Sequence, residues 1–217
     1  MVDFKFDKAG SFRPFPGTSM VSMLRPEMSQ YGLIAELQRG LKALPSARSF
    51  AFLPPSSFHM TVKDLLCDQV RESEHWTSKI PRDASLAAAD ARLAELTRGI
   101  AFGGALRMRF AGIHPLGLSI KLEPADAETR EALRDYRERI SDATGIRHPN
   151  HDAYEFHISL AYLLYELNDA EKDALGRFLA EAGKDLERRF GVLELPPPEL
   201  AFFPDMSRFP KRRPPAP

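Results

Sequence analysis

The stretch Phe58–Leu66 (FHMTVKDLL) decides the fold, because it returns in altered form as Phe156–Leu164 (FHISLAYLL). Each copy opens with Phe-His, continues with an apolar residue, a hydroxyl residue and another apolar residue, and closes with Leu-Leu. The two histidines, His59 and His157, stand 98 positions apart in the chain. A turn or loop precedes each copy, so the repeat predicts two related β-strands, one in each half of the protein.

Strand geometry gives the repeat a chemical meaning. Side chains at positions i and i+2 lie on one face of a strand, so His59 and Thr61 face one way while Met60 packs the other way. The same alternation pairs His157 with Ser159 in the second copy. Within each copy, imidazole and hydroxyl are roughly 7 Å apart, close enough to reach different oxygens of one phosphate. Two such strands placed opposite each other would supply two imidazoles and two hydroxyls to one groove.

These side chains suit the cleavage of a phosphodiester. In-line displacement at phosphorus needs a base at the attacking oxygen and an acid at the leaving oxygen. A histidine with its ordinary pKa of about 6.5 can serve as either. His59 and His157 are therefore the candidate catalytic pair. Thr61 and Ser159 can donate hydrogen bonds to the non-bridging oxygens, so they are the candidate phosphate-binding residues. This chemistry requires no metal and no other cofactor.

A single His-x-Ser/Thr pattern is weak evidence for such a site. The segment His75-Trp76-Thr77 also fits the pattern, but it lies in a polar stretch without strand character, so we interpret His75 as a loop residue. The evidence lies in the repetition of the whole nine-residue pattern with its apolar flanks. The alternative, that both motif histidines are core residues with satisfied hydrogen bonds, stays open at this point.

The paired motifs resemble the two-histidine (2H) phosphoesterase superfamily, whose members include LigT-like RNA ligases and cyclic phosphodiesterases. The resemblance extends from about Thr18 to Phe203, and the two motifs are its specific part. It implies a bilobal α+β fold in which two pseudo-symmetric antiparallel β-sheets with flanking helices surround a central groove. The turn LPPSSFHMTV and the arm SFRPFPG resemble an uncharacterised bacterial branch of the superfamily.

The resemblance also implies an activity. This is the metal-independent hydrolysis of a cyclic or linear phosphodiester, such as a 2′,3′-cyclic phosphate, in a nucleotide or a short RNA. His59 and His157 would form the acid–base pair, and Thr61 and Ser159 would bind the phosphate oxygens. Two alternatives remain open: a nucleotide- or RNA-end-binding or sensing module with little turnover, and RNA 2′-5′ ligase-like activity.

The hydrophobic pattern by itself predicts an α+β protein with largely antiparallel sheets. Strands outnumber helices and are often adjacent, without the regular strand–helix–strand alternation of a doubly wound fold. Helices are expected over residues 29–41, 86–100, 126–143 and 169–189. Strands are expected over residues 18–24, 48–53, 58–65, 105–113, 117–123, 156–164, 192–195 and 199–203.

We expect these elements to form a single bilobal domain over residues 18–203. Residues 1–17, rich in Gly, Pro and Phe, would form an irregular N-terminal arm. Residues 204–217 would form a Pro-rich, basic tail extended into solvent. Residues 68–84 have the polar composition of an inserted loop.

Composition limits the partner and the compartment. Lys and Arg together number 30, as do Asp and Glu, so the chain has no overall field to attract a long nucleic acid. This balance favours a small nucleotide or short RNA as substrate, and no obligate protein partner is evident. Cys67 is the only cysteine, which excludes an intrachain disulfide and suits a reducing compartment. Without a signal peptide or an apolar run of ~20 residues, we expect a cytoplasmic protein with no membrane segment.

Lys63, Tyr162 and Arg13 are further candidates for substrate contacts. Lys63 follows the first motif's threonine by two positions, so on a regular strand it would share the face of the motif. Arg13 would bring positive charge from the arm. Tyr162 would face away from the groove on a regular strand, and Tyr154 and Tyr165 are alternatives for stacking on a base.

A metal site is a second interpretation of the region before the second motif. His148, His151, Asp152 and His157 are residue types that bind zinc. A zinc site built from them would leave His59 without a role, so we favour the metal-free interpretation.

Overall fold

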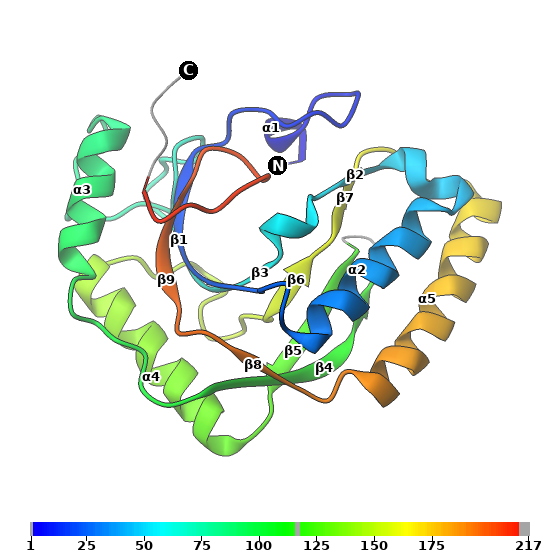
Figure 1. Cartoon of the computed structure of the whole chain (residues 1–217). Coiled ribbons are helices and arrows are strands. Elements are labelled where there is room, and N and C mark those ends of the chain that lie inside the picture. Colours follow the sequence, from blue (N-terminus) through cyan, green and yellow to red (C-terminus); the bar gives the residue numbers. More distant parts are fainter. Residues whose placement is uncertain (1, 116–117, 213–217) are drawn as a thin grey trace.

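The computed structural model describes residues 2–115 and 118–212, which form the elements of Figure 1. The helices are α1 (Val2–Lys5), α2 (Ser29–Lys42), α3 (Leu86–Leu96), α4 (Ala127–Thr144) and α5 (Asp169–Arg189), with 3-10 turns η1 (Pro45–Ser49) and η2 (Pro55–Ser57). The strands are β1 (Gly17–Met23), β2 (Phe50–Phe52), β3 (His59–Cys67), β4 (Leu106–His114), β5 (Ser119–Pro124), β6 (His157–Ser159), β7 (Ala161–Leu163), β8 (Val192–Leu195) and β9 (Glu199–Phe203). Position 117 of an expected strand and positions 213–217 of the expected tail lie outside the described residues.

The strands form one large and one small antiparallel sheet. The large sheet has seven strands in the order β8-β4-β5-β6-β3-β1-β9, and β2 pairs with β7 in the small sheet. This confirms the predicted α+β class with antiparallel sheets and flanking helices. The large sheet is curled (Figure 1), and the strands expected in two pseudo-symmetric sheets are joined edge to edge within it. Strands β9, β1 and β3 form one half, and β6, β5, β4 and β8 form the other.

The two halves of the large sheet meet where the motif strands lie side by side. Strands β3 and β6 are antiparallel, and Met60 pairs with Ile158 between them. Both side chains are fully buried, at 0% exposure. The apolar residue at the centre of each motif therefore anchors this junction in the core, as strand alternation predicts.

The helices cover the sheet and position its loops. Helix α4 packs on β3, β4 and β5, whereas α5 packs on α2 and β4. Helix α4 begins where the Asp126 side chain accepts a hydrogen bond from the Thr129 N–H, and it ends at Gly145, whose φ of 71° is left-handed. No described helix has both the length and the apolar character that a membrane crossing requires.

A β-bulge follows the first motif directly. The pairing of β3 with β1 skips one position between Thr61 and Lys63, so Val62 is an extra residue on β3. The bulge reverses the alternation of faces along the strand. Lys63, expected on the motif face, is 2% exposed and lies on the opposite side, while Asp64 turns to the motif face instead.

The strand expected over residues 156–164 is interrupted at Leu160. Strand β6 stays in the large sheet, whereas β7 joins the small one. The Leu160 N–H donates to the Leu118 carbonyl, and the Leu160 carbonyl accepts from the Leu53 N–H, both at 2.9 Å. This interruption turns Tyr162 toward the motif face, which a regular strand would not do.

Residues 2–17 of the arm and 204–212 of the tail fold over the same end of the molecule (Figure 1). The arm buries Phe6 and Phe15, and the tail buries Met206. The Phe15 N–H donates to the Pro204 carbonyl at 2.9 Å, so the two segments contact each other. The expectation of a tail extended into solvent is therefore wrong for residues 204–210, because their apolar side chains are stabilised by packing against the arm.

The insertion of residues 68–84 is irregular, as expected, but it is fixed to the core. Trp76 and Ile80 are buried, and the Trp76 Nε1–H donates to the Ile80 carbonyl at 2.9 Å. Thr77 Oγ1 donates to the Thr144 carbonyl at the end of α4 at 2.6 Å. The insertion is therefore held against α4 by apolar burial and hydrogen bonds together.

Candidate active site

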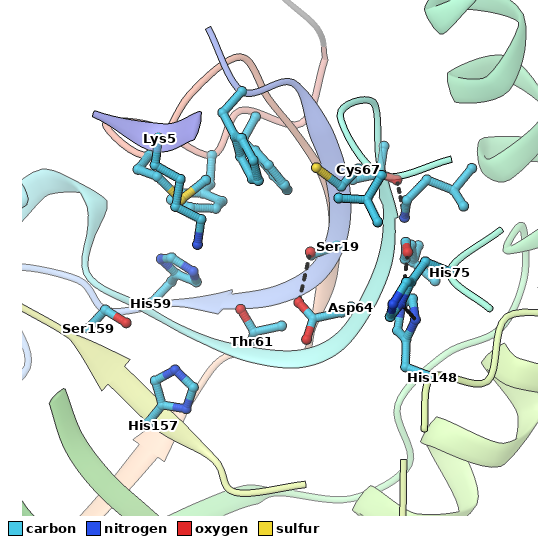
Figure 2. A pocket seen from close by; sticks show the side chains of 18 of the residues that line it. Lys5, Ser19, His59, Thr61, Asp64, Cys67, His75, His148, His157 and Ser159 are labelled. Atoms are coloured by element: carbon cyan, nitrogen blue, oxygen red, sulfur yellow. Dashed lines mark hydrogen bonds between the residues drawn. The ribbon is translucent and has the colours of Figure 1, made fainter. Parts of the chain in front are cut away.

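A cavity of about 510 Å³ lies over the junction of β3 and β6 (Figure 2). This volume is in the range of sites that bind small molecules. The lining includes Lys5, Phe15, Ser19, His59, Thr61, Asp64, Cys67, His75, His148, Asn150, Tyr154, His157, Ser159, Tyr162, Phe203, Met206 and Phe209. Segments far apart in the sequence, including both terminal ones, therefore contribute to one cavity.

The four predicted motif residues all line this cavity. Because Met60 pairs with Ile158 in an antiparallel register, His59 lies across from Ser159. By the same register, Thr61 lies across from His157. The result is a two-by-two array in which each imidazole has a hydroxyl beside it on the neighbouring strand. The array has the approximate two-fold symmetry that the repeat implied.

Each motif histidine is held by a backbone carbonyl two residues earlier in the chain. The Nδ1 of His59 lies 2.7 Å from the Ser57 carbonyl oxygen, and the Nδ1 of His157 lies 2.9 Å from that of Glu155. A carbonyl oxygen only accepts, so Nδ1 carries the hydrogen in both rings. In each ring this leaves Nε2 as the nitrogen that can exchange a proton with a ligand.

Burial lowers the pKa of His59 to about 4, while the hydrogen bond to Ser57 opposes this shift. The nearby His157 lowers the pKa further, and Asp64 raises it. The ring of Phe209, from the tail, lies against the His59 ring with a centroid separation of 3.8 Å. His59 is therefore neutral near pH 7, with the lone pair of Nε2 available.

The two motif hydroxyls are free to bind a ligand. The half-buried side chains of Thr61 and Ser159 have no hydrogen-bond partner among the residues that the structure describes. Figure 2 shows them beside the two imidazoles. Donors in this position can hydrogen-bond to the non-bridging oxygens of a phosphate without first breaking a bond within the protein.

Lys5 brings positive charge to the cavity from α1. Its Nζ lies 3.4 Å from the Tyr162 hydroxyl oxygen and 4.6 Å from the centre of the Tyr162 ring. Figure 2 shows the ammonium group directed toward His59. Among the described residues that line the cavity, no other is a Lys or Arg. The sequence carried no signal for this role, because the position of Lys5 depends on how the arm packs.

The family to which the chain belongs follows from its sequence. The model of a family described as 2H-phosphodiest, a domain of unknown function (DUF1868), matches residues 5–119, more than half of the chain. The chain belongs to this 2H-phosphodiesterase family. The finding confirms the predicted 2H phosphoesterase superfamily. The match includes the first motif and ends before the second, so the inclusion of His157 in the site rests on the repeat and on strand pairing.

The 2H-phosphodiesterase fold of this chain is similar to that of a solved structure from Agrobacterium tumefaciens strain C58. That protein, ATU0111, is described as a conserved protein of unknown function. It has a TM-score of 0.89 and 29% identity, over 94% of this chain and 88% of its own. A second solved structure, TT0787 of Thermus thermophilus, has a TM-score of 0.42 and 19% identity over 86% of each chain. No curated protein matches the sequence.

Lys63 and Arg13, two predicted substrate contacts in this 2H-phosphodiesterase family member, lie outside the cavity. The buried Lys63 directs its Nζ to His151 Nδ1 at 2.8 Å, on the far side of the sheet from the motif residues. Burial lowers the pKa of Lys63 to about 8. Arg13 is exposed, and its side chain donates to the Asp3 carbonyl at 2.8 Å. The structure places neither side chain in the cavity: the bulge in β3 turns Lys63 to the other face of the sheet, and Arg13 is exposed on the arm.

Two of the three candidate tyrosines line the cavity. Tyr162 and Tyr154 both line the cavity, whereas the exposed Tyr165 donates its hydroxyl to the Lys8 carbonyl. Burial raises the pKa of Tyr154 well above its ordinary value, and the neighbouring Asp64 adds to this effect. Tyr162 and Tyr154 are thus available to pack against a substrate from within the cavity.

The residues of the zinc alternative are not brought together as one site. His151 accepts a hydrogen bond from Lys63 and donates to Glu138 Oε1 at 3.1 Å, so both of its ring nitrogens are occupied. Glu138, His151 and Asp152 do lie close together, but Arg147 pairs with both carboxylates. The structure therefore does not support the zinc alternative, because His157 belongs to the motif array and the ring nitrogens of His148 face the Leu65 carbonyl and His75.

A second histidine pair lies at the far end of the cavity. His148 Nε2 donates to the Leu65 carbonyl at 3.0 Å, and its Nδ1 lies 3.3 Å from the Nδ1 of His75. His75 is a loop residue, as predicted, although its position on the cavity was not foreseen. Cys67 also lines this end, and burial raises the pKa of its thiol, which disfavours the reactive thiolate form.

Proposed function

We propose that this chain hydrolyses a phosphodiester in a small nucleotide or short RNA by two-histidine acid–base catalysis. The observation that carries the proposal is the two-by-two array of His59, Ser159, Thr61 and His157 in one cavity. Membership in the 2H-phosphodiesterase family supports the class of reaction. The overall charge balance and the cavity volume of about 510 Å³ favour a small substrate.

His59 is the proposed base. Its Nδ1 hydrogen is bound to the Ser57 carbonyl and its pKa is lowered to about 4, so its Nε2 is unprotonated near pH 7. With a 2′,3′-cyclic phosphate, this nitrogen would take a proton from the attacking water. A P–O bond to the water oxygen would then form as one P–O bond to the sugar breaks.

His157 is the proposed acid. In its protonated form, its Nε2 would donate a proton to the departing sugar oxygen while its Nδ1–H stays bound to the Glu155 carbonyl. The histidines lie diagonally across the array, which suits groups that act on opposite sides of one phosphorus. After the step His59 carries the proton that His157 has lost, and exchange with solvent restores the starting state.

Thr61, Ser159 and Lys5 are proposed to stabilise the negative charge that develops on the phosphoryl oxygens. The two hydroxyls would each donate a hydrogen bond, and the Lys5 ammonium group would add a point charge from the arm. These donors are already in position, so they need little reorganisation as the charge develops. We further propose that the reaction needs no metal, because imidazoles, hydroxyls and one ammonium group supply every role that it requires.

The test is turnover of 2′,3′-cyclic nucleotides and short oligonucleotides by purified wild-type protein and by His59→Ala and His157→Ala variants. Each variant should lose about 10²–10⁴-fold in kcat, the usual contribution of one proton transfer. His114→Ala, at the end of β4 and outside the cavity lining, is the control. Full activity in both motif variants on a real substrate would falsify the assignment.

Two further outcomes separate the alternatives. Tight nucleotide binding without product after long incubation would favour a sensing module, and joining of RNA ends would favour a ligase. Turnover should be the same with and without a chelator. Loss of turnover that added zinc restores would contradict the metal-free mechanism.

A further inference from the structure

The two-by-two array has two different ends. Strand β3 runs past the array to Asp64, whereas β6 and β7 run in the opposite direction to Tyr162. Both of these residues line the cavity. The cavity therefore extends beyond one histidine–hydroxyl pair toward Tyr162 and beyond the other pair toward Asp64.

The end at Tyr162 is positively charged. Lys5 Nζ lies 3.4 Å from the Tyr162 hydroxyl oxygen and 5.3 Å from the centre of the Phe15 ring. Within the described residues, Lys5 has no ion pair with a carboxylate. Aromatic rings hold its ammonium group without neutralising it, so its charge is available to a phosphate oxygen near His59 (Figure 2).

The end at Asp64 has the opposite character. The Asp64 carboxylate accepts a hydrogen bond from Ser19 Oγ at 3.5 Å and also interacts with the Tyr154 hydroxyl. The charges of Lys63 and Arg137 act on Asp64 as well, but among the described residues neither forms an ion pair with it. Tyr154 and His148 lie at this end, and burial favours the neutral form of both because it raises the pKa of Tyr154 and lowers that of His148. None of the described Lys or Arg side chains lines this end of the cavity.

From this polarity we propose that the site selects phosphodiesters whose only charged group is the scissile phosphate. The remainder of such a substrate carries hydroxyl or amino donors rather than a second phosphate. The inference rests on the proposed function and names its substrate class. The scissile phosphate binds between the histidines with its oxygens toward Lys5. The nucleoside part extends toward Asp64, whose carboxylate accepts hydrogen bonds from sugar hydroxyl or base amino groups.

Asp64 is then a specificity-determining residue, because it attracts donors and repels a second anion. The test compares adenosine 2′,3′-cyclic phosphate carrying a 5′-hydroxyl with the same compound carrying a 5′-phosphate. Wild-type kcat/KM should be roughly ten-fold or more higher for the 5′-hydroxyl compound, since the Asp64 carboxylate and a 5′-phosphate carry like charges that repel strongly in a partly desolvated site. Equal kcat/KM values for the two compounds would overturn the proposal.

In the Asp64→Asn variant, the kcat/KM values of the two compounds should differ by no more than about two-fold, mainly because kcat/KM for the 5′-phosphate compound rises. Asp64 is exposed to the cavity, so the substitution leaves the core unchanged. Asp83→Asn makes the same charge change at an exposed position outside the cavity and should keep the wild-type preference. A preference that survives in Asp64→Asn would show that another group sets it.

Lys5→Met tests the other end. It should raise KM for both compounds by a similar factor and leave the preference between them intact. Lys8→Met, an exposed lysine of the same arm that lies outside the cavity lining, is the matched control. An unchanged KM in Lys5→Met would show that Lys5 does not bind the phosphate.

Binding separates a failure of this inference from a failure of the proposed function. Calorimetry gives the dissociation constants of adenosine 2′-monophosphate and adenosine 2′,5′-bisphosphate whether or not the protein turns over a substrate. A preference for the monophosphate that Asp64→Asn abolishes, without turnover of any compound, supports the polarity and contradicts hydrolysis. Turnover without discrimination between the 5′-hydroxyl and 5′-phosphate compounds overturns the polarity alone.

Discussion

The ring of Phe209 lies against the ring of His59, with centroids 3.8 Å apart and planes tilted by 42°. Phe209 comes from the tail and also packs on Phe203 at the end of β9. It shields one side of the imidazole from water, and so contributes to the burial that lowers the pKa of His59 to about 4. A residue near the C-terminus thus tunes the proposed base in the first half of the chain.

Replacing Phe209 with Ala should therefore raise the pKa of His59 from about 4 toward the ordinary value of about 6.5. Because His59 must be neutral to act as a base, the acid limb of the kcat/KM profile should move to higher pH. Titration of the histidine ring protons by NMR measures the pKa directly. Phe4→Ala, at an arm residue that is 54% exposed, is the control and should shift neither quantity.

Acid should destabilise the fold between about pH 6.5 and pH 4. Burial lowers the pKa values of His59, His148 and His151 below the unfolded value of about 6.5, so the unfolded state binds protons first. The stabilisation is fully present above that value and is lost as the pH falls through the folded pKa values. Urea unfolding at several pH values should give a shallower dependence for His59→Gln than for wild type. Parallel curves for the two proteins would show that His59 contributes nothing to the acid response.

Truncating a buried side chain at the junction of β3 and β6 should destabilise the fold. Ile158→Ala removes a fully buried side chain from the Met60–Ile158 pair, and we expect a loss of about 2–5 kcal/mol in the free energy of unfolding. Ile158→Val, which removes one methyl group, should cost about 0.5–1.5 kcal/mol. Val192→Ala, at a position that is 51% exposed, should have little effect. Denaturant titration measures all three values, and an Ile158→Ala cost as small as that of Val192→Ala would contradict the expectation.

Arg137 should matter to both motifs, although it lies outside the cavity lining. Its guanidinium donates to the Val62 carbonyl beside the first motif and to the His151 carbonyl, 2.6 Å away, before the second. It also lies over the rings of Tyr154 and Phe156. Arg137→Lys keeps the charge but cannot span both carbonyls, so the free energy of unfolding should fall by about 2 kcal/mol. kcat should fall as well.

The matched control for Arg137 is Arg134→Lys on the exposed face of α4. It should match wild type in both kcat and denaturation midpoint. If Arg137→Lys behaved in the same way, the two carbonyl contacts would not be needed to hold the motif strands in place.

The buried position of Lys63 gives a separate prediction. Lys63→Met should leave KM for a phosphodiester within about two-fold of wild type, because the Lys63 ammonium faces His151 and not the cavity. Steady-state kinetics on the substrate identified for the wild type would measure this. A large rise in KM would show that Lys63 contacts the substrate after all, as expected if β3 were a regular strand.

The residue pattern along each strand predicted one part of the candidate site but not the rest. Alternation and repetition predicted that His59, Thr61, His157 and Ser159 would share one face, because period two is a property of each strand alone. They could not predict the bulge at Val62, which depends on how β3 pairs with β1. Lys63 was therefore assigned to the wrong face.

The same limit applies to contributions from distant segments. The interruption at Leu160 arises because its backbone bonds to two other parts of the chain, and it decides where Tyr162 points. Lys5 and Phe209 reach the cavity only through packing of the arm and the tail against the sheet. Neither segment has a periodic pattern that would have indicated such packing.

The pairing of Met60 with Ile158 also bears on the order of events during folding. These residues are 98 positions apart, so bringing them together closes a long loop of chain, and contacts of this kind form slowly compared with local ones. The array of imidazoles and hydroxyls does not exist until that closure is complete. Recovery of the proposed activity after dilution from denaturant should accordingly follow the slowest refolding phase, so turnover would report the finished fold.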